Sequence, residues 1–166
     1  MENLFVFLAT SLVLRLSHPK FKRYFIGSGS SALLVAGNKT LHCKTTKDGD
    51  RISFYDQTVQ GVTYGLVLVQ MKEVYTLQQA ENILVQYINR VRRPFGIAYN
   101  ISMHIEKKNG IVTLTDYWQD EEGKDWKIKG YTNGKTVSLL YVRNISNAPV
   151  KEHDDFLNGF RFSRIS

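Results

Sequence analysis

Cysteine is almost absent from this sequence, since Cys43 is the only one among 166 residues. A disulfide within the chain is therefore excluded, and the fold does not depend on an oxidising compartment. One cysteine and four histidines also give no zinc-binding spacing. We predict neither a metal ion nor a cofactor from these residues.

Proline is scarce as well, with three residues, and there is no low-complexity tract or internal repeat. This composition argues against disorder. Hydrophobic residues make up 43% and charged residues 22%, which is typical of a globular protein, and nine tyrosines, nine phenylalanines and two tryptophans can fill a core. The length fits one domain.

No apolar run is long enough to span a bilayer, which takes about 20 residues. The longest is Leu4 to Leu14, and it follows an acidic Glu2 where an export signal normally carries positive charge. This segment is a first core element, an atypical signal or anchor, or a stretch outside the fold. We expect residues 1–30 to be this apolar and basic segment and 31–166 a single α+β domain, with a linker-like boundary at Gly27 to Ser31.

The net charge of +7 is concentrated at the N-terminal end of the sequence. Basic residues there are Arg15, Lys20, Lys22, Arg23, Lys39, Lys44 and Lys47, against the single acid Glu2. Lys20, Lys22 and Arg23 could contact a membrane surface, or they could form an ordinary solvated face. The location is cytoplasmic or, if the first segment is a signal or anchor, the cell envelope.

The clearest predicted element is a helix that begins near Thr76. Thr76 and Gln79 fit a capping box, and apolar residues then recur at helical spacing as far as Val91. Pro94 ends the helix, and Arg90, Arg92 and Arg93 in its last turn complement the helix dipole.

Strand-like segments lie on both sides of this helix. Before it are residues 31–37, 40–46, 51–55 and 62–71, and after it are residues 97–106, 111–118, 126–131 and 137–143. Short turns, two of them containing Asn-Gly, force neighbouring strands to pair antiparallel. A short helix over 153–159, with Asp154 and Asp155 in its first turn, completes an α+β fold in which one long and one short helix cover an antiparallel meander.

Catalytic signatures are missing. There is no glycine-rich phosphate loop. His42 and Cys43 are adjacent on a strand and point to opposite faces, so they cannot form a nucleophile–base pair, and we expect Cys43 to be buried or half-buried. His104 and His153 have no evident active role. We therefore predict no catalytic residues and no enzyme activity.

The most distinctive candidate for binding is the hairpin with two tryptophans. Trp118 and Trp126, together with Tyr117, flank an acidic loop and could form a hot spot for a protein partner, or simply a cross-strand pair that stabilises the hairpin. The cluster Arg90, Arg92 and Arg93 is the second candidate partner-binding site. The signal for nucleic acid is weak, because Lys124, Lys127 and Lys129 are offset by nearby acids.

Two stretches carry a resemblance to a known fold. Tyr64-Gly65-Leu66-Val67 precedes the helix, and Phe156-Leu157-Asn158-Gly159-Phe160-Arg161-Phe162 looks like the Phe-Leu-x-Ser-Phe-x-Phe ending of PsbP-like domains, with Gly159 in place of Ser. The resemblance covers about residues 51–162. It implies a domain that binds other proteins, as the photosystem II extrinsic subunit and Ran-binding import factors do, and it carries over no site residues.

The sequence thus favours a non-enzymatic protein-binding or assembly module. The alternatives are an envelope-associated protein tethered by its first segment, or a small-ligand binding protein with a pocket between helix and sheet.

Overall fold

The structure is a computed structural model that describes residues 18–27, 29–37 and 40–163. The apolar segment from Leu4 to Leu14 therefore lies outside the described residues. The elements, in chain order, are β1 (Phe21–Gly27), β2 (Ser30–Val35), β3 (His42–Thr45), β4 (Arg51–Val59), β5 (Val62–Gln70), α2 (Leu77–Arg92), β6 (Ile97–Lys108), β7 (Ile111–Asp120), β8 (Asp125–Thr132), β9 (Thr136–Arg143), the 3-10 turn η1 (Ile145–Asn147) and α3 (Val150–Leu157).

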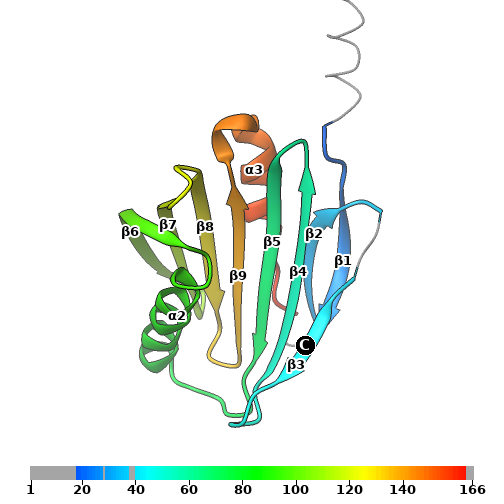
Figure 1. The fold of residues 1–166 in the computed structure, drawn as a ribbon. Coiled ribbons are helices and arrows are strands. Elements are labelled where there is room, and N and C mark those ends of the chain that lie inside the picture. The colour runs from blue at the N-terminus through cyan, green and yellow to red at the C-terminus, as the bar shows by residue number, and fades with distance from the viewer. Residues whose placement is uncertain (1–17, 28, 38–39, 164–166) are drawn as a thin grey trace, which may run out of the picture.

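The centre of the fold is a seven-stranded antiparallel sheet with the order β3-β4-β5-β9-β8-β7-β6. Two meanders, β3-β4-β5 and β6-β7-β8-β9, meet where β5 pairs with β9. Helix α2 carries the chain from β5 at the centre to β6 at the far edge (Figure 1). The predicted α+β class, with an antiparallel sheet and two helices packed on it, is confirmed.

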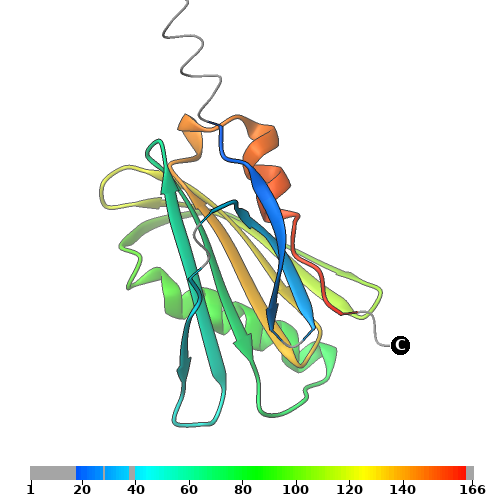
Figure 2. The same cartoon turned by 90° about the vertical axis from the view of Figure 1, so that its right-hand side faces the viewer.

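Both faces of the sheet are covered. Helix α2 packs on one face, while the β1–β2 hairpin and α3 lie on the other (Figure 2). Alternation along β5 supplies both cores, because Val67 and Val69 belong to the α2 side whereas Leu66 and Leu68 belong to the hairpin side. This two-sided burial explains why β5 reads as an almost continuous apolar run.

Helix α2 forms as its sequence predicts. The Thr76 side chain accepts a hydrogen bond from the Gln79 backbone N–H, and the Gln79 side chain accepts one from the Thr76 backbone. Ala80, Leu84 and Ile88 are buried against the sheet. The helix ends at Arg92, with Arg93 as its C-cap directly before Pro94.

The boundary expected at Gly27 to Ser31 falls between two strands that pair with each other. It joins β1 to β2, and these strands pair antiparallel from Phe21 opposite Val35 to Gly27 opposite Ser30. Gly27 and Gly29 have φ values of 120° and 72°, which glycine adopts readily. The β1 strand is thus an element of the fold that precedes the expected start of the domain.

The short C-terminal helix begins earlier than predicted, at Val150 instead of His153. Pro149 takes the N-cap position, where its fixed φ suits the entry to a helix. Glu152 is the acid of the first turn. The expectation that Asp154 and Asp155 occupy that turn is therefore wrong.

Candidate functional site

Trp118 on β7 and Trp126 on β8 are directly opposite each other, with ring centroids 6.4 Å apart. They form the cross-strand pair that the hairpin suggests, but both belong to the α2-side core and are 0% and 5% exposed. Phe95 stacks on Trp126 with centroids 5.1 Å apart. In this conformation the indoles offer no surface to a partner.

The Trp118 indole is held by a buried carboxylate. Its Nε1 donates to Asp116 Oδ2 over 2.6 Å, and Arg92 donates to the same oxygen over 2.9 Å. The Arg92 guanidinium also lies 5.5 Å from the Trp118 ring centroid. Arg92 thus neutralises an Asp116 side chain that is fully buried. This arginine, a candidate for partner binding in the sequence, therefore has a role within the fold.

A second carboxylate, Asp120, organises the other end of the hairpin. Its Oδ2 accepts from Trp126 Nε1 over 2.9 Å and from Arg143 Nε over 2.7 Å, and its Oδ1 accepts the backbone N–H groups of Glu122 and Lys124. Burial alone would raise the pKa of Asp120, but the hydrogen bonds from Trp126 and Arg143 outweigh it and the pKa is lowered. The acidic loop is therefore fixed by its own side chains.

The remaining predicted residues are dispersed. Tyr117 is half-buried on the opposite face of the sheet, where Lys127 Nζ lies 5.5 Å from its ring centroid. Arg90 and Arg93 are exposed at the end of α2. The structure therefore brings together Trp118, Trp126 and Arg92 but leaves the other three apart from them.

Strand β6 carries the surface that sequence reasoning missed. We define the β6 edge surface as Tyr99, Ile101 and Met103, whose exposed fractions are 67%, 66% and 40%. Within the described sheet β6 is an edge strand that pairs only with β7. Its first half contains two irregularities, between Ile97 and Tyr99 and between Asn100 and Ser102, whereas pairing is regular from Ser102 to Lys108.

Cations flank this apolar surface. Arg93 precedes β6 closely in the chain, and Lys108 ends the strand; both are exposed. Neighbouring Lys107 is paired with Glu81 and donates to Gln78 over 3.3 Å. The exposed apolar side chains therefore occupy the first half of β6, with Arg93 before the strand and Lys108 at its end, and the exposed Glu106 lies between them and Lys108.

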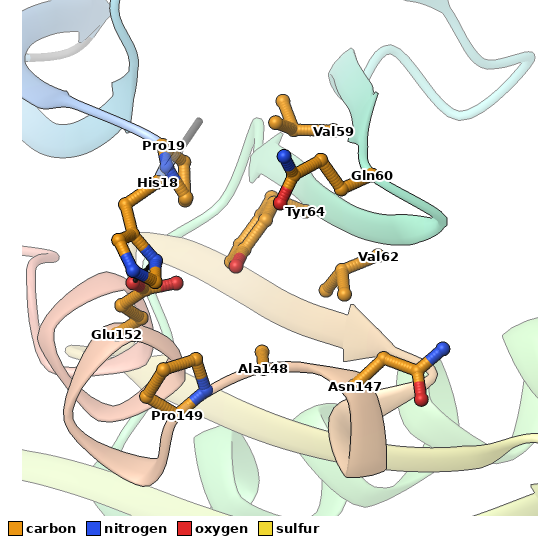
Figure 3. Close-up of a pocket in the computed structure, with 10 residues that line it drawn as sticks. All are labelled: His18, Pro19, Val59, Gln60, Val62, Tyr64, Asn147, Ala148, Pro149 and Glu152. Carbon is orange, nitrogen blue, oxygen red and sulfur yellow. Dashed lines mark ion pairs between the residues drawn. The ribbon is translucent and has the colours of Figure 1, made fainter. Parts of the chain in front are cut away.

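A cavity of about 300 Å³ opens at one end of the molecule. It lies between the start of β1, the β4–β5 turn and the start of α3 (Figure 3). The walls are His18, Pro19, Val59, Gln60, Val62, Tyr64, Asn147, Ala148, Pro149 and Glu152. These residues are far apart in the sequence, so no local pattern predicts the cavity.

Polar side chains of His18, Glu152, Tyr64 and Gln60 line this cavity beside apolar ones (Figure 3). His18 Nδ1 lies 2.5 Å from Glu152 Oε1. Burial and the Glu152 charge raise the pKa of Tyr64 to about 12, so its phenol stays protonated near neutral pH. Gln60 reaches over Tyr64 from the β4–β5 turn, where its φ of 52° is unusual for a glutamine.

Cys43 is exposed, which corrects the expectation that it is buried or half-buried. The reason is its place in β3, an edge strand whose four residues are all exposed. Hydrogen bonds with Ser53 and then Arg51 lower the pKa of the Cys43 thiol.

His153 is buried on α3 with its Nδ1 3.6 Å from Asp154 Oδ1. Burial lowers the pKa of His153, so the neutral ring is favoured. His104 is exposed beside Glu106. Among the residues that the structure describes, no group of three or more His, Cys, Asp and Glu side chains converges to hold a metal ion.

The basic residues expected near a membrane surface differ in their surroundings. Lys20 and Lys22 are exposed. Arg23 is half-buried and donates to the Gly159 carbonyl over 2.8 Å and to Ser31 Oγ over 3.1 Å. No helix in the described part of the chain has the length and apolar character needed to cross a bilayer.

No protein-family model and no curated protein matches the chain. The function must therefore be inferred from the geometry itself.

Proposed function

We propose that this protein is a non-enzymatic protein-binding or assembly module and that it binds an extended segment of another protein along β6. The observation that carries this proposal is the β6 edge surface, where Tyr99, Ile101 and Met103 are exposed on one strand. Met103 lies on the α2 face of the sheet, opposite Asp116, and Tyr99 on the other face, opposite Gln119, so exposed apolar side chains stand on both sides of one open strand edge. An edge strand also has backbone groups to which a further strand can be added.

The length of β6 and the charges near its ends indicate what kind of partner segment it binds. β6 has 12 residues, enough to template an extended peptide along its regular part from Ser102 to Lys108. Arg93 and Lys108 place positive charge at the two ends. The partner segment should therefore be β-forming, apolar where it meets Tyr99 to Met103, and acidic at its two ends.

The irregular first half of β6 limits where a partner strand can pair. Bulges and lysines are devices that keep sheet edges from aggregating. A partner strand that pairs with Ser102 to Lys108 would bind selectively, because Tyr99 and Ile101 would contact its side chains. The irregular first half of β6 would still protect the edge from aggregation.

Within this proposal the fold is PsbP-like. The support is a central antiparallel sheet with α2 on one face and α3 on the other, together with the Phe156-to-Phe162 ending. Domains of that kind mostly bind other proteins, which agrees with the role proposed here.

Selection from a displayed library of 12-residue peptides tests the proposal. Recovered peptides should combine an apolar, β-forming stretch with acidic ends. Ile101→Lys should weaken their binding by about tenfold or more, because a buried apolar contact would be replaced by an uncompensated charge. Binding is measured by fluorescence anisotropy, and thermal melting checks that the variant is folded.

Phe25→Lys is the matched control, since Phe25 is 81% exposed on β1, outside the β6 edge surface. It should leave peptide binding unchanged. A proline in the middle of a bound peptide should abolish binding, because it removes a backbone donor. Peptides that bind wild type and Ile101→Lys equally well would refute the β6 site, and a concentration-dependent dimer lost in Ile101→Lys would identify a second copy of this chain as the occupant instead.

A further inference from the structure

We propose that the cavity in Figure 3 binds the primary ammonium group of a small amphipathic amine, with Glu152, Tyr64 and Gln60 as its acceptors. This site is separate from β6 and does not depend on the proposed protein-binding role. Its evidence is the composition of the cavity, the half-buried Glu152 carboxylate and the backbone of Gln60.

The lining selects against anions. Among the described residues that form the walls there is no Lys or Arg, and the one carboxylate is Glu152, whose side chain is 19% exposed. The ion pair that the described residues make with Glu152 is the one to His18, whose side chain is 53% exposed. A solvent-facing imidazole can give way to a ligand cation more readily than a buried one.

The acceptors match an ammonium group in number. A primary ammonium has three N–H donors, and the cavity offers a Glu152 carboxylate oxygen, the Tyr64 hydroxyl oxygen and the Gln60 amide oxygen (Figure 3). Charge-assisted hydrogen bonds to a carboxylate are the strongest of these. The arrangement thus favours a donor-rich cation over a neutral alcohol.

Apolar residues shape the rest of the cavity. Val59, Val62 and Pro149 lie on its walls, and its volume of about 300 Å³ suits a short aliphatic chain. The ligand class is therefore a small amine with an apolar body. A polyvalent cation would leave these apolar walls unused.

Gln60 gives an independent reason to expect a ligand. The turn between β4 and β5 has positive φ at both Gln60 (52°) and Gly61 (77°), a conformation for which Asn-Gly is the favoured pair. Glutamine pays a conformational cost there that asparagine would reduce. The longer side chain reaches over Tyr64 into the cavity, which is consistent with a role in binding.

Titration of the full chain with n-pentylammonium chloride, followed by amide chemical shifts in NMR spectra, tests the inference. Shifts should be confined to residues around the cavity, such as Gly61, Val62 and Glu152. Sodium hexanoate and 1-pentanol have the same pentyl chain without the ammonium and should bind at least about tenfold more weakly. Equal binding of 1-pentanol, or no shift of these residues at about ten millimolar amine, would overturn the proposal.

Three substitutions separate binding from folding. Glu152→Gln should weaken pentylammonium binding by about tenfold or more, because the charge is lost while the shape is kept. Gln60→Asn should weaken it while leaving the melting temperature equal or higher, since asparagine suits the turn better. His18→Ala should strengthen it by freeing the carboxylate.

The directions of these changes in amine affinity and melting temperature distinguish a binding site from residues that only pack together. If the Glu152–His18 pair only stabilised the fold, Glu152→Gln and His18→Ala would both lower the melting temperature. His18→Ala would then show no gain in amine affinity. That result would overturn the inference, as would unchanged affinity in Glu152→Gln with a native melting curve.

Discussion

Asp116 shows at the scale of one residue how the hairpin is organised. Its buried side chain accepts from both Trp118 and Arg92, and its Oδ1 also accepts the Tyr117 backbone N–H over 2.9 Å. A carboxylate in such a place is stable only because its partners are complete. The acids near the tryptophans, which in the sequence look like part of a binding platform, instead anchor the core.

Asp116→Ala should therefore lower the free energy of unfolding by about 3 kcal/mol, because it leaves the Arg92 charge and the Trp118 N–H unpaired. Urea denaturation measures the loss. Asp155→Ala is the control: Asp155 pairs with Lys151 on the surface of α3, and its loss should cost less than about 0.5 kcal/mol. A cost below about 1 kcal/mol for Asp116→Ala would contradict this account.

At the scale of elements, the local signals in the sequence are sufficient to predict α2. The capping box and the helical stripe involve neighbouring residues, so both can be recognised without the fold. Strand order is different, because the pairing of β5 with β9 joins distant segments. Nothing near Tyr99 or Ile101 shows that their strand lies at an edge, so their exposure could not be predicted.

The missed β1 strand has a related cause. Gly27 to Ser31 has the composition of both a linker and a turn, and only the pairing of Phe21 with Val35 decides between them. The cavity was equally hidden, since His18, Gln60 and Glu152 meet only in the folded chain. Residues of a site gathered from separate elements leave no spacing that can be read from one sequence.

The junction of β5 and β9 depends on the absence of a side chain at Gly65. Gly65 pairs with Tyr141, and a Cβ at Gly65 would lie 1.9 Å from the Tyr141 ring. That ring cannot move freely, because it packs against Phe95 and Trp126. The glycine in the Tyr64-to-Val67 stretch therefore has a direct packing reason.

Gly65→Ala should reduce the free energy of unfolding by about 1–3 kcal/mol, since the added methyl displaces the Tyr141 ring. Chemical denaturation measures it. In the double variant Gly65→Ala with Tyr141→Leu, the smaller side chain should relieve the clash, so the total cost should be less than the sum of the two single costs. Additive costs would show that the two residues do not interact as described.

At the scale of the whole molecule, the fold is a sheet whose two faces are covered by different elements, α2 on one face and the β1–β2 hairpin with α3 on the other. On the face opposite α2, Phe21 of β1 packs on Tyr64 and Phe156 with ring centroids 5.3 and 5.7 Å apart. The β1–β2 hairpin is therefore part of the cover that makes this face a core.

A chain that begins at Ser31, where the sequence suggested the domain starts, should be poorly stable because it lacks β1. We expect it to lose at least about 3 kcal/mol relative to the full chain, comparable to deleting one buried aromatic side chain. Thermal melting and binding of a hydrophobic dye would measure the loss and the exposed apolar surface. A melting curve like that of the full chain, without dye binding, would place β1 outside the cooperative unit.

The meeting of β5 and β9 also bears on how the chain reaches its native state. Thr63 pairs with Arg143 and Gln70 with Thr136, so the whole of α2, β6, β7 and β8 lies between the partners. Each meander can form from neighbouring strands, but their union must close a long loop and lose its conformational freedom. Joining the two halves is therefore the slow event expected for this topology, and until it happens the sheet has two additional open edges that other chains can reach.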